Sequence, residues 1–325
     1  MGRDKEAGIL KRMKILIGYD GSACANAAID NLRKAGLPRH ADALVLSAAD
    51  VFLPAGRDVR MPEAIKASIQ RLRAAAMNQV KQATMSAKQA STKIKSMFPG
   101  WNVKSESGAD SPAWAILKRA ERWKPDLIVV GAHGHSKLGR FLGSVSQMVL
   151  TQASCSIRVG RASPRPKSRS LRVLIGIDGS PDSKATVQSI LSRSWPSGAK
   201  FLLVSVIDPM KLTFIERLAV ANIRWFLKQA LDERGITGRM LESFAKKLRE
   251  RNKDVTCRIR KGDPRRVLVK EAEAWQADCI FVGARGLTHV KRFFIGGVST
   301  AVAARAHCSV EVVRLKTTRG SSWKQ

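Results

Sequence analysis

The sequence predicts an α/β protein made of two tandem domains, each a doubly wound, mostly parallel five-stranded sheet with flanking helices. Three observations carry this prediction. Blocks of sequence recur in the same order in the two halves of the chain. Within each half, short apolar β-branched runs alternate with amphipathic segments, which is typical of parallel sheets with helical crossovers. The chain of 325 residues is also long enough for two domains.

The internal repeat is clear in three pairs of segments. MKILIGYDGSACANAAI (13–29) matches LRVLIGIDGSPDSKATV (171–187), and KPDLIVVGAHG (124–134) matches QADCIFVGARG (276–286). ASCSIRVGR (153–161) matches AHCSVEVVR (306–314). We therefore expect a first domain over 1–160, a second over 171–316 and a basic tail over 317–325. The joining segment 161–170, RASPRPKSRS, is rich in proline, serine and arginine, as exposed linkers are.

The first copy reads as five strands separated by helices. KILIGYD (14–20) is a buried strand, and the Asp-Gly-Ser that follows begins a helix ending near Gly36. Apolar residues at steps of three and four from Ile65 to Met97 predict one long amphipathic helix over 63–97. The remaining strands are expected at 41–50, 101–107, 126–131 and 155–161, and the remaining helices at 111–123 and 143–153.

The second copy follows the same order but differs in its middle. The segment 211–231 is apolar on more than one face, which indicates either an extra packing surface or a helix filling an enlarged core. Gly235 and Gly238 are expected to interrupt this helix before it resumes at Met240.

Charge and composition limit the possible partners. With 58 Lys and Arg against 26 Asp and Glu, the chain carries a formal charge of +32, which attracts polyanions non-specifically. Aromatic residues make up only 6% of the chain, which argues against base stacking as a recognition device. The N-terminus does not read as a signal peptide, and no apolar run is long enough to span a bilayer. The five cysteines are dispersed without a CxxC pair, as expected for reduced thiols in a cytoplasmic protein without a zinc site.

The ends of the first and fourth strands of each copy should form a binding rim. Ligands of open parallel sheets lie beyond the carboxyl ends of the strands. Asp20 and Asp178 end the first strands, and Gly131 and Gly283 end the fourth. Glycine there can adopt positive φ and bring bare backbone N–H groups against an anion. A helix starting at Ser144 would add its N-terminal dipole, while the carboxylate would suit a ribose hydroxyl or a magnesium ion. Ordinary turns and helix caps are the alternative explanation of the same residues.

This arrangement resembles the universal stress protein family in its tandem form, from about Met13 to Arg314. The family motif is Gly, two residues, Gly, nine residues, Gly and then Ser or Thr, after the fourth strand. The resemblance implies a Rossmann-like fold of the adenine nucleotide alpha-hydrolase type, with ATP phosphates and ribose held by this motif. It implies an adenine contact late in the second strand, at Ala48 and Val206. It also implies that the two domains pair through their fifth strands into an intramolecular pseudo-dimer.

Each copy departs from the motif in its own way. The first has Gly131, Gly134, Gly143 and Ser144, but eight residues instead of nine between the last two glycines. The second has Gly283, Gly286 and Gly296 with nine, but Gly297 stands where the hydroxyl belongs, so Ser299 or Thr300 would have to replace it. Loop geometry positions every donor while one hydroxyl contributes about 1 kcal/mol, which slightly favours the second copy. Basic side chains that could reach phosphate are Arg285 and Lys291 there, and His133, Lys137 and Arg140 in the first copy, although an ordinary solvent-exposed surface is the favoured explanation of these long side chains.

The expected function is that of an ATP-binding regulatory protein of the stress response, with nucleotide in one or both domains and with or without magnesium. We find no catalytic constellation in the sequence, so at most slow ATP hydrolysis is expected. One alternative is a tandem stress protein without nucleotide that acts through protein contacts, for which the 63–97 and 214–231 helices are the candidate surfaces. A basic nucleic-acid-associated protein and further association into homodimers also remain open.

Overall fold

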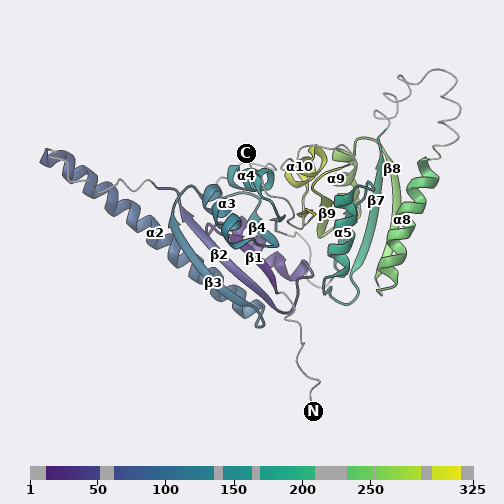
Figure 1. Cartoon of the computed structure of the whole chain (residues 1–325), viewed down its shortest axis with the longest axis horizontal. Helices are drawn as coiled ribbons and strands as arrows, with labels where there is room; N and C mark the ends of the chain where they lie inside the picture. The colour runs from purple at the N-terminus through teal and green to yellow at the C-terminus, as the bar shows by residue number, and fades with distance from the viewer. Residues whose placement is uncertain are drawn as a thin grey trace, which may run out of the picture.

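The computed structural model describes residues 12–51, 62–134, 142–162, 169–208, 233–251, 253–286 and 295–315. Within these ranges the strands form one sheet in the order β3-β2-β1-β4-β5-β10-β9-β6-β7-β8 (Figure 1). The first half contributes β1 (Met13–Gly18), β2 (Ala41–Ala49), β3 (Asn102–Ala109), β4 (Leu127–Gly131) and β5 (Ser156–Gly160). The second half contributes β6 (Arg172–Gly176), β7 (Lys200–Ile207), β8 (Asp254–Lys261), β9 (Cys279–Gly283) and β10 (Ser309–Val313).

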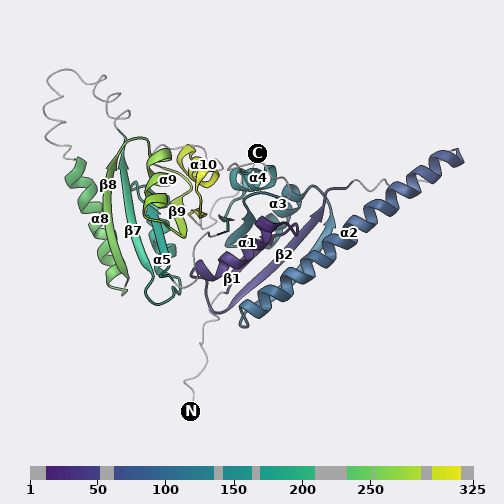
Figure 2. The same ribbon diagram turned by 180° about the vertical axis from the view of Figure 1, so that it is seen from behind.

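Helices cover both faces of the sheet, as the alternation of strands and helices predicts. One face packs against α3 (Pro112–Trp123), α4 (Ser144–Gln152), α9 (Pro264–Ala274) and α10 (Gly297–Arg305). The other face packs against α1 (Ala23–Asp30) and α2 (Glu63–Met97) in the first half, and α5 (Pro181–Leu191) and α8 (Glu233–Arg249) in the second (Figure 2). Successive strand residues serve opposite cores, since Leu16 lies in one cluster and Ile15 and Ile17 in another. The doubly wound α/β architecture is thereby confirmed.

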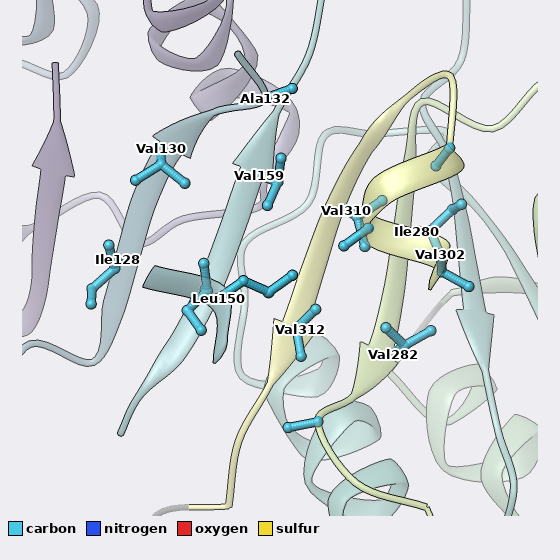
Figure 3. Packing of buried hydrophobic residues seen from close by; sticks show 14 of the residues in the cluster. Ile128, Val130, Ala132, Leu150, Val159, Ile280, Val282, Val302, Val310 and Val312 are labelled. Carbon is cyan, nitrogen blue, oxygen red and sulfur yellow. The ribbon is translucent and has the colours of Figure 1, made fainter. Parts of the chain in front are cut away.

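The two halves meet where β5 and β10 pair antiparallel, while every other strand pair in the sheet is parallel. Val159 lies opposite Val310, and Ile157 lies opposite Val312. The apolar cluster beneath these strands runs without a break from one half into the other, as Figure 3 shows for Ile128, Leu150 and Val302 among others. One hydrophobic core thus serves both halves on this face of the sheet.

Helix α2 has the bounds that its periodicity predicts, but its apolar stripe is buried along only part of its length. Ala87, Ala90 and Ile94 are buried against β2 and β3. Toward the N-terminus the same stripe is exposed, with 49% of Ile65 and 64% of Leu72 accessible. The N-terminal part of α2 accordingly extends beyond the sheet (Figure 1).

The expected interruption at Gly235 and Gly238 is wrong, because α8 begins at Glu233 and runs through both glycines. Glycine in a helix costs about 1 kcal/mol relative to alanine, and burial of Leu241, Phe244 and Leu248 offsets this cost. The predicted 211–231 helix, the basic tail and most of the linker lie outside the described residues, as do Lys137, Arg140 and Lys291.

Gly160 allows α1 to lie directly on β5, and this contact yields a testable prediction. A Cβ on Gly160 would lie 2.4 Å from the Cα of Ala28, whereas a Cβ on Gly108 in β3 would meet nothing within 4 Å. Gly160→Ala should therefore lower the free energy of unfolding by about 1–3 kcal/mol through overpacking. Gly108→Ala should leave it unchanged or slightly raised. Urea unfolding of both variants measures the difference, and equal effects would contradict the packing of α1 on β5.

Candidate functional site

The Asp-Gly-Ser sequence builds the same turn in both halves. Asp20 Oδ1 accepts a hydrogen bond from the backbone N–H of Ser22 at 3.0 Å, and Gly21 takes φ +80°. Ser22 then caps α1 by accepting from the N–H of Ala25 at 3.1 Å. Asp178, Gly179 and Ser180 repeat this arrangement ahead of α5. One oxygen of each aspartate is therefore used in shaping the turn, as the capping explanation anticipated.

The strand-ending glycines are required by close packing and not by positive φ. Gly131 and Gly283 are both absent from the positive-φ glycines of the described residues, which corrects the reason given for them from sequence. A Cβ on Gly131 would lie 3.0 Å from the backbone N of Ala25, and one on Gly283 would lie 2.8 Å from the backbone of Asp182. These glycines let the N-termini of α1 and α5 approach the strand ends, so a bulky substitution would displace a helix as well as a ligand.

The loop after each fourth strand returns to the sheet at the expected helix. Gly143 N–H donates to the Ala132 carbonyl at 2.8 Å, and α4 begins at Ser144 as predicted. Gly296 bonds the Ala284 carbonyl in the same way before α10, which begins at Gly297. The first N–H groups of α4 have no partner within the helix and are suited to an anion.

Two serines hold the loop where it returns to the sheet. Ser146 was not predicted from the sequence, and Ser299 was expected to replace the missing hydroxyl of the motif. Ser146 Oγ donates to the Gly131 carbonyl at 2.5 Å, and Ser299 Oγ does the same to Gly283. Ser299 is thus engaged with the strand end and Thr300 bonds the Gly296 carbonyl, so neither replaces the hydroxyl missing at Gly297. The signal for Ser146 was present in the repeat, since both copies carry serine three residues after the last motif glycine.

A cavity of about 280 Å³ lies at the first-half rim, and we call it the first-half pocket. All six residues predicted for the first copy line it: Asp20, Ala48, Gly131, Gly134, Gly143 and Ser144. A Cβ on Gly134 would lie 2.9 Å from Asp20 Oδ2, so the first strand's carboxylate and the loop glycine are neighbours.

The remaining wall of the first-half pocket was not anticipated from sequence. Its apolar part is formed by Leu46, Ile116 and Val130, and Tyr19 and Pro112 add to the lining. Leu46 and Ala48 stand on the same strand, two residues apart, so they share one face of β2. The pocket therefore joins an apolar wall to a polar end built from Asp20, the glycine loop and α4, a combination suited to a ligand with a flat apolar part and an anionic part.

The second-half rim is occupied by an ion pair. Arg285 Nε lies 3.1 Å from Asp182 Oδ2, its Nη2 lies 3.1 Å from Oδ1, and its backbone N–H bonds the same carboxylate at 3.0 Å. Asp182 is 2% exposed, and the hydrogen bond to it raises the pKa of Arg285. The sequence left Arg285 open to a phosphate contact or, by preference, an ordinary surface role, and the structure pairs it with Asp182.

The two halves differ at both members of this pair. The positions equivalent to Asp182 and Arg285 are Cys24 and His133 in the first half. Comparing the copies position by position would have shown that both residues change together. The residues predicted for the second copy stand at positions equivalent to those of the first-half pocket, around a rim that also contains the Asp182–Arg285 ion pair. They are Asp178, Val206, Gly283, Gly286, Gly296 and Gly297.

His133 lines the first-half pocket, and the guanidinium of Arg161 lies near it. Burial lowers the pKa of His133, and the nearby guanidinium of Arg161 lowers it further, so the imidazole is neutral at pH 7. Arg161 itself crosses to the other half, where its Nη2 donates to the Ala303 carbonyl at 2.7 Å at the end of α10. Arg314, its repeat equivalent, donates to the Leu150 carbonyl at 3.3 Å in α4. In each half, the arginine after the fifth strand thus hydrogen-bonds the helix that follows the glycine loop of the other half.

Three further findings concern the chemistry of the described residues. No cluster of three or more His, Cys, Asp or Glu in the described ranges is arranged to hold a metal ion. None of the helices in that part of the chain has the length and apolar character that a bilayer crossing requires. Cys155 is partly buried, and the burial of its thiol raises its pKa to about 12, so the thiol is protonated at neutral pH.

Comparison with known proteins bears on both halves. The family model described as the universal stress protein family matches residues 11–160 and again 170–314. A universal stress protein of Mycolicibacterium smegmatis is 30% identical over 223 residues, covering 66% of this chain and 70% of that protein. The crystal structure of a universal stress protein from Archaeoglobus fulgidus is 19% identical with a TM-score of 0.57, covering 93% of this chain and 98% of that one. Another universal stress protein, solved in complex with cAMP, covers 45% of this chain and 98% of its own at 22% identity and a TM-score of 0.31.

The matches to the family model account for most of the chain and coincide with the internal repeat. The chain therefore belongs to the universal stress protein family, with one copy of the family's domain in each half.

Proposed function

We propose that this chain is a nucleotide-binding regulator of the stress response that holds ATP, or another adenine nucleotide, in the first-half pocket. The observation that carries the proposal is the pocket itself, because six residues predicted from the family motif and the strand ends line one cavity. The base would lie against the apolar wall near Ala48 and Ile116. The ribose would lie near Asp20, and the phosphates at the glycine loop and the start of α4.

We further propose that the first half is the nucleotide-binding half. The motif spacing favoured the second half. There, however, the Asp182–Arg285 ion pair lies on the rim and engages the Arg285 side chain, which was a candidate for contacting phosphate. In the first half the equivalent residues are a cysteine and a histidine that is neutral at pH 7. Release of Arg285 would leave the 2% exposed carboxylate of Asp182 without that cation, which opposes binding of an anion at this rim.

In this proposal the two halves act as an intramolecular pseudo-dimer, and ATP biases its conformation for a cytoplasmic partner. Nucleotide at about 1 mM with a Kd of about 1 μM would stabilise the bound state by about 4 kcal/mol, enough to shift a conformational equilibrium. Hydrolysis, if it occurs, would be slow and would reset the state. The exposed N-terminal stripe of α2, including Ile65 and Leu72, is the surface that a protein partner would cover.

Filling the base region tests the placement with a matched control. Ala48→Phe should abolish or weaken ATP binding at least tenfold, because the ring would occupy the apolar wall of the first-half pocket. Val206→Phe makes the same change at the equivalent position of the second half and should leave binding unchanged. Isothermal titration with ATP, ADP, AMP and cAMP, with and without magnesium, measures both variants. Loss of binding in Val206→Phe alone would place the nucleotide in the other half.

His133 supplies a pH-dependent test of the same site. Its lowered pKa means that the folded state disfavours protonation, so the associated stability is complete above about pH 6.5 and is lost as pH falls through the folded pKa. Phosphate groups beside the ring would raise this pKa, so ATP should bind more tightly as pH falls toward that range. NMR titration of the imidazole, assigned with His133→Gln, measures the pKa with and without ATP. A pKa that ATP leaves unmoved would contradict phosphate at the loop.

A further inference from the structure

The antiparallel pairing of β5 and β10 has a local two-fold axis that passes between Arg158 and Glu311. The register sets Glu311 opposite Arg158, Val310 opposite Val159 and Val312 opposite Ile157. In the repeat, 157, 158 and 159 are equivalent to 310, 311 and 312. Arg158 and Glu311 therefore occupy the same position in their two copies, and each lies opposite its own equivalent. A residue on a two-fold axis would face another copy of itself in any pair of identical halves.

Both axis residues are buried, and both halves of the chain supply polar contacts to them. Arg158 and Glu311 are each 0% exposed, and Arg158 Nη1 lies 3.2 Å from Glu311 Oε2. Arg158 Nη2 donates to Asn31 Oδ1 at 2.6 Å. Arg193 of the second half also pairs with Glu311 and bonds the Ala35 carbonyl of the first half at 2.8 Å. The carboxylate of Glu311 thus pairs with two guanidinium groups, one fully and one almost fully buried.

Pairing between two first halves would remove this compensation. Two first halves would bring Arg158 against Arg158 on the axis, with no buried carboxylate between them. Two second halves would bring Glu311 against Glu311, but each carboxylate would keep the Arg193 of its own half, so the charge selection acts on the first half. Burying like charges in contact opposes association strongly, and natural interfaces use such repulsion to reject wrong partners. We propose that the Arg158–Glu311 pair selects unlike halves, so that this β5 edge accepts a fifth strand bearing a carboxylate on the axis and rejects a second copy of itself.

A second contact beside the axis has the same asymmetry in shape. A Cβ on Gly36 would lie 2.7 Å from the ring of Trp195, and the Ser194 N–H bonds the Gly36 carbonyl at 3.0 Å. The first half supplies the space and the second half supplies the ring. In the repeat Gly36 is equivalent to Ser194 and Trp195 to Leu37, so two second halves would bring the Trp195 ring against Ser194, which has a Cβ where Gly36 leaves room.

The test uses the whole protein with its connection cut. A protease site is placed within 163–168, the folded protein is cleaved, and both pieces are unfolded, refolded together and examined by native mass spectrometry. Wild-type pieces should form at most about one like pair in a hundred. The R158L/E311L protein should show at least tenfold more like pairs, because the axis no longer carries charge. R260L/E271L removes a partly exposed Arg–Glu pair away from β5 and β10 and is the matched control, expected to behave as wild type. Equal shares of like pairs in wild type and R158L/E311L would overturn the proposal.

The intact chain gives an independent measurement through urea unfolding. E311R recreates the Arg–Arg axis of two first halves and should lower the folding equilibrium constant more than about 100-fold. R158L leaves Glu311 paired with Arg193 and should lower it less than about tenfold. If E311R were no more destabilising than R158L, charge on the axis would not govern the pairing and the proposal would be wrong.

Discussion

The antiparallel contact between β5 and β10, with Arg158 opposite Glu311 at its centre, is the interaction on which the arrangement of this protein depends. It joins two five-stranded sheets into one and makes the core on one face continuous. A buried ion pair adds little net stability compared with apolar side chains, so in the proposal above its role is to select which halves pair. Arg161 and Arg314 extend the contact by reaching the last turns of α10 and α4, the helices whose first turns form the two rims.

Duplication followed by divergence explains the two unequal rims. Both keep the Asp-Gly-Ser turn, the packed glycine at the end of the fourth strand and the serine that holds the loop return. Around this common scaffold the first half keeps a pocket with an apolar wall, while the second carries the Asp182–Arg285 pair. In the proposed function the first half binds nucleotide, and the second half pairs with it in the intramolecular pseudo-dimer.

Much of the fold follows from sequence because periodicity and repetition act locally. The bounds of α2 and the start of α4 at Ser144 came from spacing alone. The reason for Gly131 did not, because the approach of α1 to β4 is a tertiary contact that no local pattern encodes. The Asp182–Arg285 pair joins residues 103 positions apart, which explains why the sequence did not reveal the partner of Arg285. The glycines of α8 were misjudged because burial of Leu241 and Phe244 outweighs their propensity.

The count of nucleotides held by each chain tests the central claim of unequal rims most directly. Equilibrium dialysis with labelled ATP, carried to saturation on the intact protein, measures this number without any substitution. The account predicts one nucleotide per chain. Two per chain would show that the Asp182–Arg285 pair does not close the second rim, and none would show that the first-half pocket has another purpose.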